Sequence, residues 1–278
     1  MTSHRRQSGR LRLSMLVTIA VFVLAALTII PFLWMFDASF APTTVILGSG
    51  DSLFPRPTTF HNYGSIQTKF DFGRLFLNSL AISTIRTVII VYISALFGFV
   101  FAKLRFRGRR LLFALLLSSM MVPWPVTMLP LSDMMMQFQW IDTYTALVVP
   151  GLVSASGIYM FRQAMRAIPD QLLDAARIDG AGDCRIFHSI ALPLCRNTVC
   201  ALAIFTFLAN WDSYLWPYLM ITSPQKQLLA VGLQQVNGQY GTDYGGLFAA
   251  TSLAILPMML IYMLFQRRFI AGLFDSVG

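Results

Sequence analysis

The residues best suited to recognising a polar molecule lie together near the end of a long apolar stretch, where the sequence reads Asn-Trp-Asp-Ser-Tyr-Leu-Trp-Pro. The amide of Asn210 and the carboxylate of Asp212 can hydrogen-bond hydroxyl groups. The rings of Trp211, Tyr214 and Trp216 can stack on the apolar faces of pyranose rings. Tryptophan and tyrosine are also common in the interfacial belt of membrane proteins, so a packing role stays open.

A second candidate segment contains three closely spaced prolines, Pro123, Pro125 and Pro130. Prolines at this density must break or kink a helix and leave carbonyl groups unpaired. At membrane depth such backbone is tolerated only against protein or water. We therefore place Trp124 and Pro125 beside a cavity or a helix interface, where they would join the possible path of a solute. A simple packing kink is the alternative.

Two ionisable residues, Arg86 and Asp212, fall within apolar stretches. A charge at membrane depth is unfavourable unless it is paired or hydrated. The two could form a structural ion pair, Asp212 could face a polar cavity, or either could contact a partner chain. A proton relay is poorly supported, because a single acid has no chain of partners.

The sequence lacks the residues that an enzyme active site or a metal site would need. We expect no catalytic residue, because no nucleophile or cluster of histidine and acids occurs at membrane depth. We expect no metal site, because the three histidines are scattered and the three cysteines lack ligand spacing. None of the three lysines follows a glycine, so the chain has no Walker A sequence to bind ATP.

The composition predicts that membrane helices position these residues. The 278 residues are 56% hydrophobic and only 12% charged. Apolar runs of about 20 residues recur, the length that crosses a bilayer as a helix. We predict an all-α, polytopic protein with six transmembrane helices and treat the first as retained rather than as a signal peptide. The spans are about 14–36, 76–102, 111–131, 144–165, 197–221 and 246–266.

The distribution of basic residues predicts the orientation. Sixteen Lys and Arg residues fall in the tails and loops on one side, and four fall on the other. By the positive-inside rule both termini are cytoplasmic, and the protein is a multi-pass protein of the cytoplasmic (inner) membrane. The net charge of +9 needs no nucleic acid to explain it, since these loops face anionic membrane lipid.

We divide the chain into three parts. Residues 1–75 comprise a cytoplasmic tail, the first helix and an extracytoplasmic connector, which we expect over 37–75 to be irregular and without a core of its own. Residues 76–267 form a five-helix core that contains a cytoplasmic loop at 166–196. Residues 268–278 form a cytoplasmic tail.

The loop from Pro169 to Pro193 is polar, charged and helix-forming. Proline suits a first helical turn, and Gly180 is a good residue to end the helix. A second short helix is predicted from about Asp183 to Ser189. The result would be a compact knob able to enter a cleft of a soluble partner, or else an ordinary interfacial helix.

The spelling of this loop resembles the EAA loop of binding-protein-dependent ABC importer permeases. The matching residues are Asp174, Ala175, Ala176, Asp179, Gly180, Ala181, Phe187, Ile190, Leu192 and Pro193. The chain departs from the family pattern where the family Glu is Asp174 and the usual last Pro is Asn197.

Further segments resemble the carbohydrate-uptake subfamily, and the chain is most similar to maltose-permease G-type subunits. These segments are Phe106–Arg110, Ile168-Pro169, Asn210–Pro217 and Tyr240–Tyr244. The resemblance implies a type I importer permease fold and a loop that inserts into a separate ATPase subunit, which binds ATP and Mg. It also implies three kinds of partner: a second, usually different permease, two ABC ATPases and an extracytoplasmic solute-binding protein.

Three alternatives stay open. The first is an ion-coupled secondary carrier that acts alone. The second is an importer of a related kind for a non-sugar solute such as a glycerophosphodiester. The third is a membrane-embedded enzyme, which the residues favour least.

Overall fold

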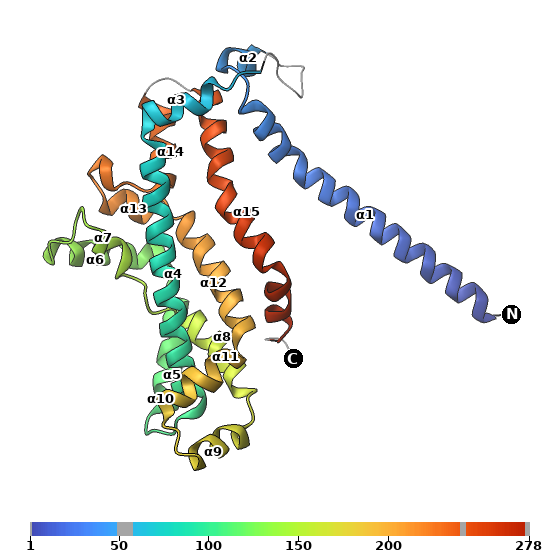
Figure 1. Ribbon diagram of the computed structural model, residues 1–278, viewed down its shortest axis with the longest axis vertical. Helices are drawn as coiled ribbons and strands as arrows, with labels where there is room; N and C mark the ends of the chain where they lie inside the picture. The colour runs from blue at the N-terminus through green and yellow to red at the C-terminus, as the bar shows by residue number, and fades with distance from the viewer. Residues whose placement is uncertain (1, 49–57, 240–242, 276–278) are drawn as a thin grey trace. The chain divides into compact units, whose positions relative to one another are not determined.

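The structure is a computed structural model that describes residues 2–48, 58–239 and 243–275 (Figure 1). Over these residues the chain is helical and contains no strand, which confirms the all-α class. Part of the Tyr240–Tyr244 motif and of the 268–278 tail lies outside the described residues. Contacts group the chain into two compact units, one of Met1–Asp71 with Gln235–Leu253 and one of Phe72–Gln234 with Ala254–Gly278.

The first unit contains more structure than the sequence suggested. Its helices are α1 (Thr2–Ala38), α2 (Thr43–Gly48), α3 (His61–Phe70) and the start of α15 (Tyr244–Asp275). The side-chain amide of Asn62 in α3 is buried and donates to the carbonyls of Ser39 and Ala41, at 2.8 and 2.9 Å. The expectation of an irregular connector without a core was therefore wrong for its described part. These bonds join residues more than 20 positions apart, so no local pattern in the sequence could predict them.

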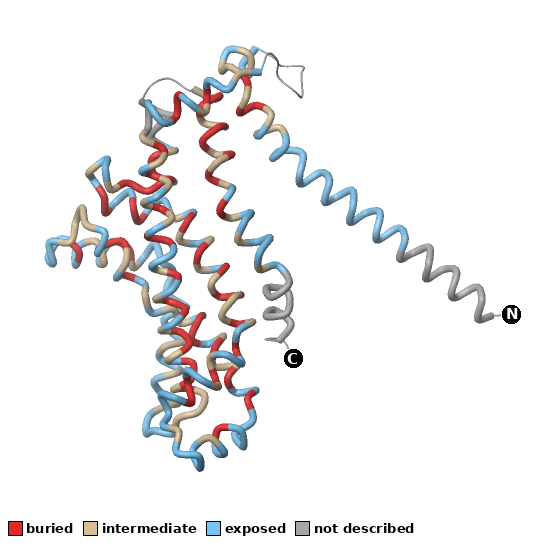
Figure 2. The backbone as a smooth tube through the Cα atoms, viewed as in Figure 1, coloured by how far each residue is buried: buried red, intermediate tan, exposed pale blue. Residues whose placement is uncertain are grey.

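The second unit is built around α4 (Phe72–Lys103), which packs against α8 (Ala155–Arg166) and α12 (Arg196–Trp211). At 32 residues, α4 is about 48 Å long. Small residues allow close approach to α8, as in many membrane helix pairs. A methyl group on Gly98 would lie 2.5 Å from Cβ of Phe161. Figure 2 shows buried residues along all three helices.

Shorter elements complete both units. They are α5 (Arg109–Ser118), η1 (Ser119–Met121), α6 (Trp124–Gln137), α7 (Tyr144–Val148), α9 (Asp170–Ile178), α10 (Asp183–Ile186), η2 (Phe187–Ala191), α11 (Leu192–Leu194), α13 (Leu215–Met220), η3 (Pro224–Lys226) and α14 (Leu229–Gln239).

Three helices in the described part of the chain are long and apolar enough to cross a membrane: Met15–Ala38, Phe72–Lys103 and Tyr244–Gln266. They match the first, second and sixth predicted spans. Every residue from Met15 to Leu33 is exposed, and this part of α1 is almost entirely apolar, as lipid contact requires.

The other predicted spans are interrupted. The third is a pair of helices bent by 100° at the break before Trp124, where proline was expected to disrupt it. The fifth stops at Trp211 and resumes as α13, and the fourth divides into α7 and the 12-residue α8. Counting two bent pairs as spans gives up to five crossings in the described residues. Six crossings with cytoplasmic termini stay a prediction.

Candidate functional site

Local backbone rules fix both ends of α9. Pro169 precedes the first helical residue with an extended ψ of 133°. At the other end Gly180 has φ +82°, a left-handed conformation that glycine adopts without a steric penalty. The N–H of Gly180 donates to Arg177 O at 3.0 Å, and that of Ala181 donates to Ala176 O at 2.9 Å. These two bonds form a Schellman motif, so Gly180 ends the helix at the position that the sequence predicted.

The helix α9 has one face in the core and one face open. Leu173 is 1% exposed and packs with partly buried Ala176 into the cluster that holds α4, α8 and α10 together. On the other side, Leu172, Ala175 and Ile178 are exposed, and Ile178 is 87% exposed. Their spacing of three residues places them along one side of a helix. A helix this short is unstable alone, so the packing of its buried face sets its position, and its other face stays exposed.

The acidic residues of the loop surround one arginine. The guanidinium of Arg177 donates to Asp174 at 2.9 Å and to Asp183 at 3.2 Å. These hydrogen bonds, to Asp183 first and then to Asp174, raise the pKa of Arg177. Asp179 is exposed beside them. Sequence reasoning missed Arg177, although its spacing of three residues from Asp174 on a helix was a readable signal.

Phe187 anchors the second half of the loop. It is 1% exposed, with its ring 5.6 Å from that of Phe99 in α4. The predicted second helix starts at Asp183 as expected but continues to Leu194, through the π-helical η2. Pro193 has no N–H to give, and a wider turn avoids the clash of its ring with the preceding turn. Leu192 is partly buried against the same cluster, and Pro193 is exposed.

Lys103, the last residue of α4, connects this helix to α9. Its Nζ donates to the carbonyl of Ile168 at 2.6 Å and to the carboxylate of Asp170 at 2.6 Å. The Lys103 side chain is 6% exposed, and its hydrogen bond lowers the pKa of Asp170. Sequence reasoning missed this link, because nothing local relates residues 103 and 170. Figure 1 shows that α9 lies at the end of the second unit where α4 ends.

The residues predicted to line a path fall into two groups. Trp211 and Trp216 are buried, and their indole N–H groups donate to the carbonyls of Ala254 and Ala146, at 3.1 and 2.9 Å. In this conformation they are core residues whose polar atoms are already paired.

The second group is accessible. Trp124, Pro125, Asp212 and Tyr214 are exposed, and Asn210 is half-buried. The ring of Trp124 meets that of Trp216 edge-on at 5.8 Å, which brings the broken third span and α13 together. The structure thus joins the two segments that the sequence singled out and leaves Trp124 open beside that junction.

Arg86 binds backbone rather than an acid. Its guanidinium donates to the carbonyls of Leu147 at 2.7 Å and Pro150 at 3.1 Å, where α7 ends. No ion pair between Arg86 and Asp212 occurs in the described part of the chain, so the possible pairing of these residues was wrong. The arginine satisfies carbonyls that the break between α7 and α8 would leave unpaired.

Asp142 joins the turn after α6 to the loop after α13. Its carboxylate accepts from the Oγ and N–H of Ser223, the ammonium of Lys226 and the N–H of Thr222. These bonds, the Ser223 hydroxyl first, hold the pKa of Asp142 well below its usual range. Sequence reasoning missed this residue, whose partners are about 80 positions away.

Asp142→Asn is expected to lower the Tm of the protein near neutral pH. Asparagine tolerates the left-handed backbone at this position (φ +59°) but loses the charge. A carboxylate with a depressed folded pKa stabilises above its ordinary pKa of about 4, and this contribution is lost as pH falls below that value. Thermal unfolding in detergent should therefore show a Tm difference that narrows on acidification.

Asp133→Asn is the matched control for this experiment, because Asp133 is exposed in α6. An equal and equally pH-dependent loss of Tm in the control would contradict the role of Asp142.

Comparison with known proteins identifies the family. The family model for the "binding-protein-dependent transport system inner membrane component" matches residues 94–274, which include α8, α9 and α12. The chain belongs to this family. It is therefore a membrane subunit of a binding-protein-dependent transport system, and the loop that contains α9 lies within the matched region.

Similar proteins support this assignment along almost the whole chain. An arabinooligosaccharides transport system permease protein, AraQ of Halalkalibacterium halodurans, is 36% identical over 94% of this chain and 95% of its own length. A lactose transport system permease protein, LacG of Rhizobium radiobacter, is 34% identical over 96% and 98%. The fold matches a chain of a bacterial ABC transporter for alginate with a TM-score of 0.83, at 19% identity and 97% and 99% coverage.

Proposed function

We propose that this permease is one of two membrane chains in an ATP-driven importer of a sugar or oligosaccharide, in the cytoplasmic (inner) membrane. The names of similar permeases for arabinooligosaccharides and lactose support the solute class. The partners would be a second, different permease, two ABC ATPases that bind ATP and Mg, and an extracytoplasmic solute-binding protein. The chain itself would perform no catalysis.

The geometry of α9 carries the proposal. One side of this short helix is fixed to the core through Leu173, while Leu172 and Ile178 remain exposed. Burying an apolar side chain of this size contributes about 1.5–3 kcal/mol. A soluble partner with a matching apolar groove would gain this energy, and Asp174 and Asp179 at the rim would meet its basic residues.

The mechanism follows from how α9 is held. When ATP closes the two ATPases, they would carry the docked α9 helices of both permeases toward each other. Lys103 binds the start of α9, and Leu173 of α9 shares a buried cluster with Phe99 of α4 and with Phe187. Movement of α9 would therefore be transmitted to the membrane helices. The helices would then rock to open a cavity outward, and ATP hydrolysis would restore the inward state.

Reconstituted vesicles test the proposal. The permease, its partner permease and the ATPase are placed in liposomes with the binding protein outside, and uptake of labelled arabino-oligosaccharide or lactose is measured. We expect uptake that requires ATP inside the vesicles. Unlabelled glycerophosphodiester, added as a competitor, should leave this uptake unchanged.

Two outcomes would contradict the proposal. Uptake by this chain alone, driven by an ion gradient without ATP, would show a secondary carrier. Transport of the glycerophosphodiester and not of either sugar would retain the importer but reject the sugar class.

A further inference from the structure

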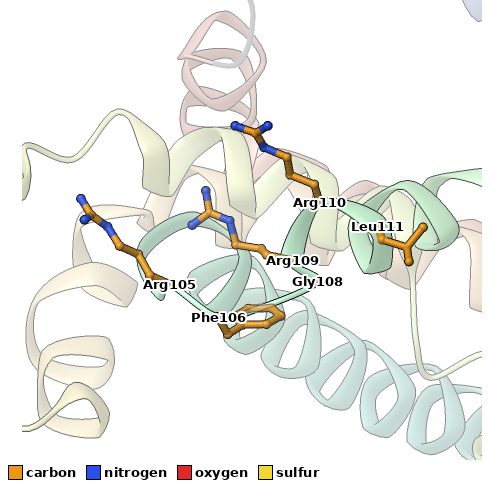
Figure 3. Close-up of a pocket in the computed structure, with 6 residues that line it drawn as sticks. All are labelled: Arg105, Phe106, Gly108, Arg109, Arg110 and Leu111. Carbon is orange, nitrogen blue, oxygen red and sulfur yellow. The ribbon is translucent and has the colours of Figure 1, made fainter.

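A basic pocket lies at the turn between α4 and α5, apart from the docking face of α9. Its volume is about 570 Å³, and it is lined by Arg105, Phe106, Gly108, Arg109, Arg110 and Leu111. Figure 3 shows the three guanidinium groups on the same side of the turn. Pockets of this size can hold small ligands or headgroups.

The charge of this pocket is not neutralised by the described part of the chain. Arg105 and Arg110 make no hydrogen bond or ion pair with any described residue. Arg109 uses one donor, to the carbonyl of Leu104 at 2.9 Å, out of the five on a guanidinium. The nearby Asp170 interacts with Arg105 electrostatically but is already bonded to Lys103. The pocket therefore keeps donors for an anion.

The start of α5 also favours the binding of an anion. Its first turn has no acidic residue, and Gly108 before it provides no side-chain cap. Two arginines at this end oppose the helix dipole, which is positive here. A bound anion would accept bonds from the free N–H groups and would offset the repulsion among the guanidinium groups.

Apolar side chains continue directly from the pocket along α5. Leu111, Leu112 and Leu115 are 65%, 50% and 57% exposed. Exposed leucines beside an arginine cluster match a ligand that has an anionic head and long apolar chains. Because α5 is the first half of the broken third span, these leucines would contact lipid chains, and the pocket at the start of α5 would lie at the level of the lipid headgroups.

We propose that this pocket binds the phosphate of an anionic phospholipid, with the lipid chains lying along the leucines of α5. Arg105 and Arg110 donate to the phosphate oxygens in the two-pronged geometry that guanidinium groups favour. This site would hold the end of α4, next to Lys103, at the membrane surface. The bonds from Lys103 to α9 would then start from a fixed position.

Native mass spectrometry of the full-length protein in detergent tests the proposal, with phosphatidylglycerol and phosphatidylcholine added at equal concentrations. Losing two charge-assisted contacts is expected to lower phosphatidylglycerol retention at least about tenfold in the double variant Arg105→Gln/Arg110→Gln. The charge-matched control is Arg107→Gln/Arg185→Gln, which removes two exposed arginines outside the pocket. The control should retain phosphatidylglycerol within about twofold of the wild type.

Folding is checked by the Tm in the same detergent. Phosphatidylglycerol should raise the Tm of the wild type and the control but not that of the pocket variant. Removing arginine from the first turn of α5 relieves an unfavourable dipole interaction, so the variant is expected to fold without lipid.

Three results would overturn the proposal. Equal losses of retention in the control and pocket variants would show general attraction to basic loops. Equal retention of phosphatidylcholine would show apolar contact alone. Displacement of phosphatidylglycerol by millimolar inorganic phosphate would assign the pocket to a free anion.

Discussion

Replacing Gly180 by proline is expected to leave membrane insertion intact and to abolish the substrate-stimulated ATP hydrolysis of the assembled importer. Proline fixes φ near −65°, whereas Gly180 has φ +82°. Proline also removes the N–H that donates to Arg177 O. The Schellman motif would be lost, and α9 would point its exposed face in another direction. Insertion should be unaffected, because it is set by the apolar spans and the basic loops.

A graded series at this position separates backbone conformation from side-chain size. A Cβ at position 180 would meet no atom within 4 Å, so Gly180→Ala tests the left-handed backbone alone. That conformation costs an alanine about 1–2 kcal/mol, and asparagine less. Stimulated hydrolysis by the reconstituted complex should therefore fall in the order Gly, Asn, Ala, Pro. Normal stimulation of the proline variant would contradict the coupling role of α9.

The elements that follow local rules could be predicted from the sequence. Pro169 and Gly180 set the ends of α9 through backbone geometry that depends on a few neighbouring residues. Pro123 predicted the break in the third span for the same reason. Pro193 was an equally clear signal for the helix end at Leu194, but it did not predict the π-helical turn that precedes it.

The details that depend on distant partners could not be predicted. Arg86 read as a buried charge in need of an acid, yet its partners are carbonyls about 60 positions away that are exposed by a break in another span. Aromatic composition also did not distinguish exposed residues, such as Trp124, from core residues such as Trp216. Tertiary packing decides which side of a helix faces the core. Local patterns in one sequence did not show that orientation for these residues.

Replacing Lys103 by methionine is expected to lower the number of solute molecules transported per ATP about tenfold, while assembly continues. Methionine keeps most of the apolar stem within the core but has no ammonium to hold Ile168 O and Asp170. The side chain of Asp170 is 78% exposed, so water would solvate its carboxylate in the variant. The substitution therefore leaves no buried, unpaired charge. The variant would mainly lose the bonds that fix the distance between the end of α4 and the start of α9. When α9 moves with the ATPase, α4 would then follow it less closely.

Two further variants distinguish this positioning role from a general effect of charge. Asp170→Asn should cause a smaller loss than Lys103→Met, because Lys103 keeps its bond to the carbonyl of Ile168. Arg107→Met, which removes an exposed cation from the adjacent turn, should transport normally. Hydrogen exchange of the α9 amides should speed up only in the Lys103 and Asp170 variants, since these alone release the first turn of the helix. If Lys103→Met retained a normal ratio of transport to hydrolysis while exchange in α9 increased, motion would reach the membrane by another route, such as the packing of Phe187 against Phe99.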